Sequence, residues 1–220
     1  MHYDPNLEDH GFKHSPFKSC VVPRPIGWIS TVSKDGVANL APYSQFQNIT
    51  YDPPIVMFSG NQRTIGKRKD TVVNVEETGE FVWNMATYEL RDAVNTSSKE
   101  FTPDVDEFDA AGLSKLPSLV VKAPRVAESP IQFECKHLQT IRIPGNGEMG
   151  SADIVIGRVV KIHIKDDALT PDGRVDIEKI KPLARLGYYN YTYVDKQFEM
   201  LPPGDDPRRL KGLAGDRVRD

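Results

Sequence analysis

The sequence predicts a mainly β protein, an antiparallel barrel or sandwich with a few short helices. Short runs rich in β-branched and aromatic residues alternate with turn-forming residues along most of the chain. No strand–helix–strand rhythm is present, and such a rhythm is what a parallel sheet requires. The strongest strand signals are two long half-apolar segments, 131–143 and 153–164.

The first elements expected along the chain form a hairpin. Residues 24–33 alternate with a period of two, as a strand does, and Asp35-Gly36 then precedes a second segment, VANLAPYSQF (37–46). Glycine tolerates the positive φ of a tight turn, so the pair of segments predicts a hairpin. After the turn-prone YDPP, the short apolar run IVMFSG (55–60) is typical of a strand buried on both faces.

Two short helices are expected next. Asp70 can cap a helix over residues 71–78, because its carboxylate can accept bonds from free backbone N–H groups, and Gly79 is placed to end that helix. A strand over 80–86 follows, and Thr87 can cap a second short helix. From about residue 98 to 124, proline and glycine breaks predict a long surface excursion.

The segments 131–143 and 153–164 are expected to pair as antiparallel strands over a core. In each, the apolar residues fall in one phase of a period of two, which puts them on one face. These residues are Ile131, Phe133, Cys135, Ile141 and Ile143 in the first segment and Ile154, Ile156, Val160, Ile162 and Ile164 in the second.

The connection between these two segments, PGNGEMG (144–150), has the Gly-x-Gly-x-x-Gly spacing of a dinucleotide-binding turn. That motif needs a helix directly after it, whose N-terminus meets the pyrophosphate. Here a strand follows, so the glycines are interpreted as the loop of a hairpin.

Composition narrows the class of protein. A net charge of −3, from 28 basic and 31 acidic residues, points to neither a nucleic-acid nor an anionic-membrane partner. The apolar runs are too short to span a bilayer, and the polar N-terminus lacks the apolar segment of a signal peptide. The sequence therefore indicates a cytoplasmic protein, in which Cys20 and Cys135 are reduced thiols.

The sequence offers no self-contained catalytic apparatus. The five histidines lack metal-ligand spacing, and neither a GxSxG elbow nor a P-loop is present, so no catalytic residue and no metal ligand is assigned. His163, which lies between two lysines, is expected to be solvated, and His137 to be packed in the core. If the protein is an enzyme, a bound organic cofactor carries the chemistry.

Two stretches are candidates for holding such a cofactor. NLAPYSQFQN (39–48) follows a hairpin with small, proline and amide residues, where backbone groups can read the edge of a planar heterocycle. SGNQRTIGKRKDT (59–71) gathers basic side chains before a helix N-terminus, and both features suit a phosphate. A solvated basic loop and an irregular strand explain the same composition, so the residues alone leave both interpretations open.

Three motifs in order, RPIGWISTVSKDGVANLAPYSQFQ, DPPIVMFS and KDTVVNVEETGEFVWN, resemble the flavin reductase-like family, and so does the later SADIVIGRVVKIHIKDDALTPDGRVDIEKIKPLARLG. The likeness runs from about Pro23 to Gly187. It implies an FMN-binding split β-barrel, antiparallel and of Greek-key type, over residues 1–195, with 196–220 as a C-terminal arm or tail. It also implies a homodimer with flavin near the interface.

The resemblance implies site residues at two ends of the flavin. The residues expected near the ribityl-phosphate end are Arg24, Ser30, Thr31, Lys69, Asp70 and Thr71. Those expected to border the isoalloxazine, largely through backbone groups, are Asn39, Ala41, Pro42, Ser44, Gln45 and Phe46, with Ser59 closing one side. Two positions depart from the family: Ala152-Asp153 stands where many relatives carry a histidine, and Tyr188-Tyr189 where a glycine is frequent.

The function that the resemblance implies is hydride transfer from NADH or NADPH to the N5 atom of non-covalently bound FMN. Electrons then pass to a further acceptor, such as a partner oxygenase. Hydride transfer depends on orientation more than on a protein acid or base, which agrees with the missing triad. Two alternatives stay open: an FMN-binding electron carrier with no nicotinamide site of its own, and a flavin-free barrel acting as a binding module.

Overall fold

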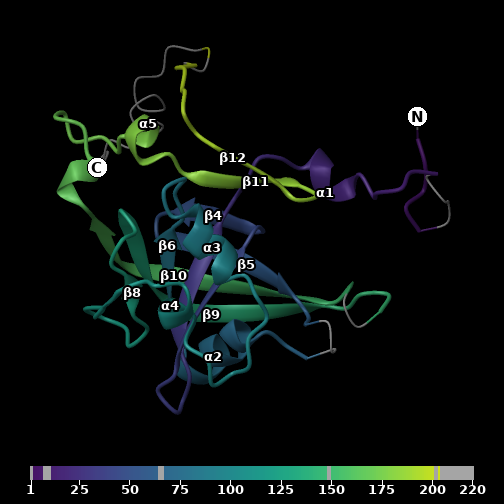
Figure 1. The fold of residues 1–220 in the computed structure, drawn as a ribbon, viewed down its shortest axis with the longest axis horizontal. Helices are drawn as coiled ribbons and strands as arrows, with labels where there is room; N and C mark the ends of the chain where they lie inside the picture. Colours follow the sequence, from purple (N-terminus) through teal and green to yellow (C-terminus); the bar gives the residue numbers. More distant parts are fainter. Residues whose placement is uncertain (1, 7–10, 64–66, 148–149, 201–202, 204–220) are drawn as a thin grey trace.

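The structure, a computed structural model, describes residues 2–6, 11–63, 67–147, 150–200 and 203 of the 220-residue chain. A seven-stranded antiparallel sheet in the order β3-β2-β6-β9-β10-β5-β4 forms its body (Figure 1). The strands of this sheet are β2 (Gly27–Val32), β3 (Ala38–Tyr43), β4 (Phe46–Tyr51), β5 (Pro54–Asn61), β6 (Glu80–Met85), β9 (Ile131–Ile143) and β10 (Ala152–Ile164).

The two edge strands of the sheet, β3 and β4, are consecutive in the chain and are joined by Ser44 and Gln45 alone. Across this corner Ser59 of β5 donates its backbone N–H to the Gln45 carbonyl at 2.8 Å. The chain therefore brings the two edges of the sheet together, which removes open edges as a barrel does. The predicted fold class, a mainly β antiparallel split barrel with a few short helices, is confirmed.

A second, three-stranded sheet in the order β1-β11-β12 lies at one end of the barrel, at the top of Figure 1. Its strands are β1 (Arg24–Pro25), β11 (Leu183–Gly187) and β12 (Asn190–Tyr193), and a two-stranded ribbon pairs β7 (Lys115–Leu116) with β8 (Arg125–Val126). The helices are α1 (Phe17–Cys20), α2 (Asp70–Thr78), α3 (Arg91–Thr96), α4 (Glu107–Ala110), η2 (Asp166–Ala168) and α5 (Ile177–Ile180).

Strand β2 is buried on both faces, so it lies between two groups of core residues. Ile29 belongs to the main core with Phe58 and Phe81, and its neighbour Trp28 belongs to a second cluster with Phe108. Because neighbouring side chains of a strand point to opposite faces, the second cluster packs on the outside of the barrel wall. This is the side covered by α3 and α4.

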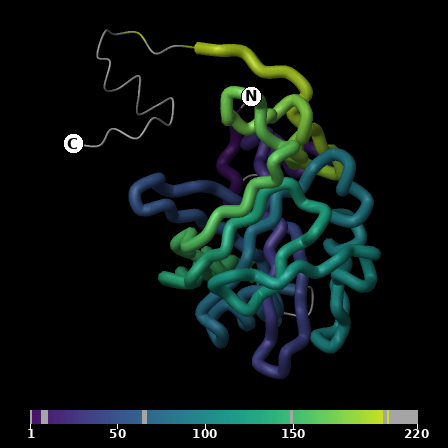
Figure 2. Tube along the Cα trace, turned by 90° about the vertical axis from the view of Figure 1, so that its left-hand side faces the viewer, coloured from purple at the N-terminus to yellow at the C-terminus, as the bar shows by residue number. Residues whose placement is uncertain are grey.

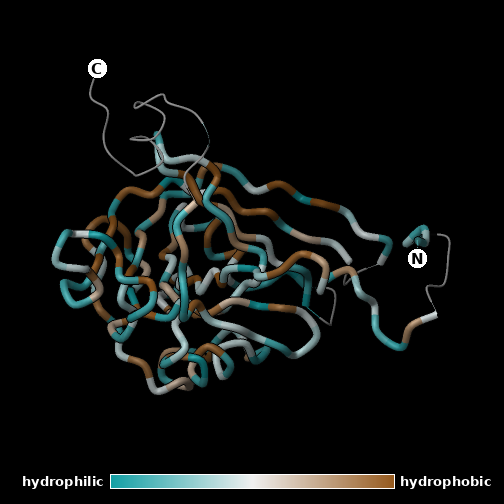
Figure 3. The backbone as a smooth tube through the Cα atoms, turned by 90° about the horizontal axis from the view of Figure 1, so that it is seen from above, coloured by the Kyte–Doolittle hydropathy of each residue, from teal (hydrophilic) through white to brown (hydrophobic). Residues whose placement is uncertain are grey.

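The predicted hairpin of β9 and β10 is confirmed, with Ala152 opposite Ile143. The predicted core face of β9 is right for Ile131, Phe133 and Cys135, which lie in or against the main core, but it is wrong for Ile141 and Ile143, and that of β10 is wrong. In β10 the buried positions are Asp153, Val155, Gly157 and Val159, while Ile162 and Ile164 are exposed. Gly157 explains why this set of residues faces the core. A Cβ at this position would lie 2.4 Å from Phe81 Cε1, so only glycine leaves room for the Phe81 ring. Figure 3 shows hydrophobic stretches both in the middle of the molecule and along strands that run toward its edge.

Two helix starts also differ from expectation. Helix α2 has Lys69 at its N-cap rather than Asp70, whose carboxylate binds Arg63 instead, although Gly79 ends the helix as predicted with φ +74°. Helix α3 begins at Arg91, because Thr87 pairs with Pro182 in a β-bridge.

Two further features concern the outside of the barrel. His163 is not solvated: its Nε2 lies 2.6 Å from the Glu134 Oε1 atom, so that expectation is wrong.

At the C-terminus, the described residues after β12 have no regular structure and run away from the body in Figure 2; most of the predicted arm lies outside the described residues. Within the described part of the chain no helix is long and apolar enough to cross a bilayer.

Candidate functional site

A small pocket opens beside the first turn of α2, and we call it the α2 pocket. Six of the sequence-predicted site residues line it: Asn39, Ala41, Pro42, Lys69, Asp70 and Thr71. Seven further residues complete the lining: Tyr43, Arg63, Ser98, Lys99, Glu100, Phe101 and Glu107. The cavity measures about 70 Å³, whereas pockets that bury a small molecule are usually of about 300–1,000 Å³. One chain therefore encloses only one end of a flavin-sized ligand.

The wall of the α2 pocket is a buried hydrogen-bond network centred on Asn39. The Asn39 amide donates to Glu107 Oε1 at 2.9 Å, and its carbonyl accepts from the Thr71 hydroxyl at 2.6 Å. The Leu40 backbone N–H donates to Glu107 Oε2 at 3.0 Å. Thr31 lies behind Asn39, 3.3 Å from the Asn39 Oδ1 atom and within reach of Asn74. Strand β3, helix α2 and helix α4 are thus joined by polar contacts at this point.

The two buried titratable groups of this wall have pKa values shifted by their surroundings. Burial raises the pKa of the Glu107 carboxyl, and the hydrogen bond from the Leu40 N–H partly offsets that rise. Burial likewise raises the pKa of the Tyr43 hydroxyl, which stays neutral at every physiological pH. That hydroxyl lies beside Thr71 yet makes no hydrogen bond of acceptable geometry within the described residues. A buried hydroxyl in this state is a donor available to a ligand.

The first turn of α2 supplies the remaining donors. None of the described side chains caps this turn, so its leading N–H groups can bind an anion, an interaction that the helix dipole favours. The cations beside it are already paired: Lys69 Nζ lies 2.7 Å from Glu100 Oε1, and Arg63 binds both Asp70 and, at 3.2 Å, the Phe101 carbonyl. A phosphate that binds here must therefore compete with the Glu100 carboxylate for the Lys69 ammonium group.

A second group of predicted residues gathers at the β3–β4 corner, outside the α2 pocket lining. Phe46 stacks on Trp83, with ring centroids 5.2 Å apart and planes 2° from parallel. Ser59 and Gln45 are joined by a backbone hydrogen bond that extends the pairing of β4 with β5 by one residue. The corner lies directly after the pocket-lining Ala41–Tyr43 segment, so a planar ligand reaching out of the pocket would pass along this backbone.

Two predicted residues point elsewhere. Ser30 is fully buried and donates to the Pro124 carbonyl at 2.6 Å, on the outer side of the barrel wall. Arg24 lies on β1 in the second sheet, where its guanidinium donates to the Val21 carbonyl at 2.8 Å and to the Lys18 carbonyl. Neither residue lines the α2 pocket.

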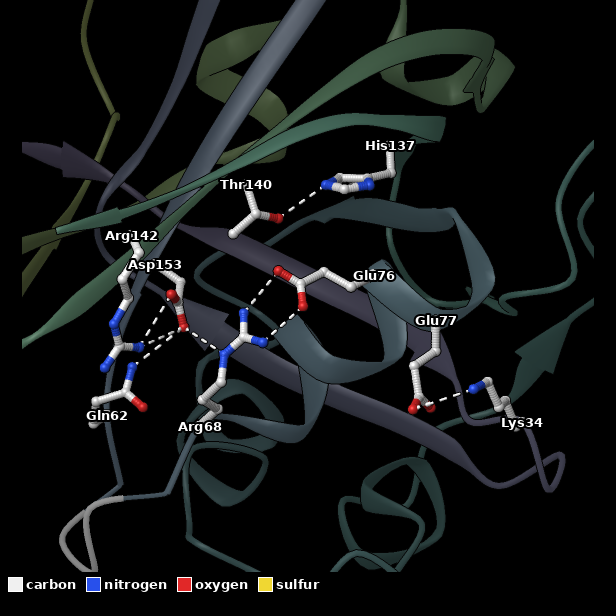
Figure 4. A network of polar contacts seen from close by, with 9 residues as sticks. All are labelled: Lys34, Gln62, Arg68, Glu76, Glu77, His137, Thr140, Arg142 and Asp153. Atoms are coloured by element: carbon white, nitrogen blue, oxygen red, sulfur yellow. Dashed lines mark hydrogen bonds and ion pairs between the residues drawn. The ribbon is translucent and has the colours of Figure 1, made fainter.

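Asp153 anchors the loop that leads into α2 (Figure 4). Its carboxylate is 1% exposed and accepts bonds from Gln62 at 3.2 Å, Arg68 at 3.1 Å and Arg142 at 3.1 Å. Arg68 in turn binds both oxygens of Glu76 on α2 at 2.7 Å. These arginine contacts hold the pKa of Asp153 below its usual range, against the effect of burial. Through Arg68, Asp153 thus fixes the start of α2 to strand β10.

Sequence reasoning missed the part of the α2 pocket formed by residues 98–101 and Glu107. They belong to the stretch expected to be a surface excursion, and the structure folds that stretch over the pocket instead. A fully buried Glu107 has no local sequence signal, because its partners lie 67 and 68 positions away. Tyr43 and Arg63 could have been predicted from the sequence, because they lie in the two candidate stretches, 39–48 and 59–71.

The fold and the pocket together define the class of protein. The chain belongs to the flavin reductase like domain family, whose sequence model matches residues 19–197. An uncharacterised protein of Aquifex aeolicus is 41% identical over 171 residues, which cover 77% of this chain and 84% of the relative.

Two solved structures extend the comparison. Nitrilotriacetate monooxygenase component B from Bacillus cereus is 32% identical with a TM-score of 0.83, covering 91% of this chain and 98% of that one. The 2-nitrobenzoate 2-nitroreductase NbaA of Pseudomonas fluorescens is 25% identical with a TM-score of 0.79, covering 94% and 98%.

Proposed function

We propose that the protein is an FMN-binding oxidoreductase that takes electrons from NADH or NADPH and passes them to a further acceptor. The observation that carries this proposal is the α2 pocket, where an uncapped helix N-terminus, a lysine and an unpaired buried tyrosine hydroxyl converge. These donors suit the phosphate end of FMN. Membership of the flavin reductase like domain family supports the same cofactor.

The residues of this chain would bind and orient FMN, which when bound supplies the hydride-accepting chemistry. Lys69 and the first N–H groups of α2, that of Thr71 among them, would hold the phosphate, and the Tyr43 hydroxyl would donate a hydrogen bond beside it. The backbone from Ala41 to Phe46 would border the ring system, as the resemblance implies. No acid or base from the protein is required for this orientation, so the chain's contribution is binding and geometry.

We also propose a homodimer, with the flavin near the interface. A cavity of about 70 Å³ cannot bury a whole flavin, so a second copy would cover the part outside the pocket. The projecting β9–β10 hairpin supports this, because it exposes Leu138, Ile141, Ile143, Val160 and Ile162. Exposed apolar side chains gathered on one element are typical of an interaction surface.

A second candidate is an FMN-binding electron carrier without a nicotinamide site. Ala152 favours it, because this half-buried residue stands where many relatives carry a histidine and offers no polar side-chain group. The acceptor is open in both cases. The similar Bacillus cereus protein is a monooxygenase component, which supports a partner oxygenase, and the similar nitroreductase supports a small aromatic electrophile.

The test is the visible absorption spectrum of the purified protein without oxygen, before and after addition of NADH and then NADPH. A flavin spectrum that bleaches within seconds supports the reductase and identifies its donor. A flavin spectrum that stays oxidised with both donors favours the carrier. A colourless protein that also fails to bind added FMN contradicts both and leaves the flavin-free binding module.

A further inference from the structure

A second cavity lies between helix α3 and the β1-β11-β12 sheet, at the end of the molecule where Figure 1 shows β11 and β12 above α3. We call it the tyrosine pocket. It measures about 420 Å³, within the range of pockets that hold small molecules. Its lining includes Tyr88, Arg91, Val94, Tyr191 and Tyr193, and it shares no lining residue with the α2 pocket.

The walls of the tyrosine pocket present aromatic faces. Tyr88 and Tyr193 pack with ring centroids 4.4 Å apart, and Tyr189 and Tyr191 also line the cavity while 94% and 40% exposed. Buried Val94 and Leu183 form the apolar floor. Aromatic side chains on an apolar floor favour a planar ring, which can stack on a tyrosine face.

Arginines border the same face of the small sheet. The strand register places Arg24 opposite Arg185 and Arg185 opposite Tyr191, so the three side chains form a row across the sheet. Leu183 of the cavity floor is two residues from Arg185 on the same strand and therefore points to the same side. The Arg185 guanidinium lies 4.4 Å from the Tyr191 ring centroid, and Arg91 lies 4.2 Å from that of Tyr88.

This cluster of positive charge is not neutralised by the described residues. None of their ion pairs includes Arg24 or Arg185, and two like charges directly opposite each other on neighbouring strands destabilise a sheet. Burial and the Arg185 charge lower the pKa of Arg24. Arg91 donates to the Tyr88 carbonyl at 2.9 Å, and its one ion pair among the described residues is with Asp92, which lies at 4.0 Å and is 91% exposed. An anion bound beside this row would relieve the repulsion.

We propose that the tyrosine pocket binds a small molecule whose planar aromatic ring carries a phosphate or carboxylate group. The ring stacks on the tyrosine faces, and the anionic group lies at the row formed by Arg24 and Arg185, with Arg91 on the opposite wall. Such a ligand has two possible sources: a nucleotide, or a small aromatic acid. This proposal does not depend on flavin binding, because its residues are separate from those of the α2 pocket.

The test is isothermal titration calorimetry on the full-length protein with two matched pairs of probes. ADP is compared with adenosine, and benzoate with benzamide, so that each pair shares a ring and differs in charge. The titrations are run with and without added FMN, which prevents ADP from occupying the flavin site. We expect one charged probe to bind at least tenfold more tightly than its neutral counterpart.

Variants locate the binding. Arg185→Gln and Tyr191→Leu should each weaken the charged probe about tenfold, whereas the matched control Arg174→Gln, on an exposed loop, should change binding less than twofold. Circular dichroism checks that each variant is folded. Tight binding of ADP alone identifies a nucleotide, and of benzoate alone an aromatic acid. Failure of both charged probes to bind at millimolar concentration, or binding unchanged in both pocket variants, overturns the proposal.

Discussion

The α2 pocket and the tyrosine pocket differ in how their charges are balanced. In the α2 pocket two of the three lining cations have a carboxylate beside them, Lys69 with Glu100 and Arg63 with Asp70, while Lys99 lies over the Phe101 ring. The wall is a buried network that also joins three elements. In the tyrosine pocket the arginines border aromatic rings on an exposed sheet. The polar wall of the α2 pocket therefore stabilises the fold as well as lining a candidate binding site, whereas Arg24 and Arg185 beside the tyrosine pocket have no carboxylate partner among the described residues.

The largest expected effect is the loss of protein stability when a residue of the α2 pocket is replaced, compared with a residue of the tyrosine pocket. Glu107→Ala removes the acceptor of the Asn39 amide and of the Leu40 N–H, which leaves two buried donors unpaired. Each unpaired buried donor costs about 1–3 kcal/mol, so the free energy of unfolding should fall by about 2–6 kcal/mol. Tyr191→Ala, on the exposed sheet, should lower it by less than about 1 kcal/mol. Urea denaturation of both variants measures the difference, and equal losses would contradict the distinction.

A second prediction concerns the ion pairs that hold α2. Asp153→Asn removes the charge bound by Arg68 and Arg142, and it should lower the free energy of unfolding by about 1–3 kcal/mol at neutral pH. The folded-state pKa of Asp153 lies below its unfolded value of about 3.9. Its stabilisation is therefore complete above about pH 5, begins to fall near the unfolded pKa of about 3.9, and is lost as the pH falls further through the lower folded-state pKa.

The measurement is urea denaturation of wild type and variant at about pH 7 and about pH 3.5. The variant should lose less stability on acidification than the wild type, because it lacks this proton-linked contribution. Asp92→Asn is the matched control, since that carboxylate is 91% exposed and lies 4.0 Å from its partner Arg91, so its loss should change the acid response little. An unchanged acid response in Asp153→Asn would show that the anchor of α2 is not electrostatic.

The strand hairpins and part of the α2 pocket could be predicted from the sequence, for physical reasons. Period-two patterning and turn glycines predicted the hairpins, and basic residues before a helix predicted the α2 pocket. Which face of β10 points to the core could not be predicted. Four isoleucines favour one face, but the close contact of Gly157 with the Phe81 ring places the other face inward. Nor could the tyrosine pocket be predicted, since Tyr88 and Tyr193 are far apart in the sequence and their rings meet only in the folded chain.

A third prediction tests the α2 pocket as the phosphate site. Lys69→Ala should weaken FMN binding about tenfold, or about 1.4 kcal/mol, with little change in stability. Riboflavin lacks the phosphate, so its affinity should stay the same in this variant. Lys34→Ala, an exposed lysine paired with Glu77, is the control. Fluorescence titration with both flavins gives the dissociation constants, and an unchanged FMN affinity would remove Lys69 from the site.

The smallest expected effect concerns the carboxylate that competes for Lys69. Glu100→Gln removes the negative charge 2.7 Å from Lys69 Nζ, so a phosphate no longer has to displace it. Partly exposed ion pairs contribute about 0–1 kcal/mol, which predicts FMN binding up to about fivefold tighter. The carboxylate in the described lining of the tyrosine pocket, Asp92, lies 4.0 Å from Arg91 and is 91% exposed, so it competes less than Glu100 does. Asp92→Asn should therefore leave binding of a charged aromatic probe within about twofold. If Glu100→Gln weakens FMN instead, Glu100 positions Lys69 rather than competing with the phosphate, and charge balance in the α2 pocket is part of how it binds.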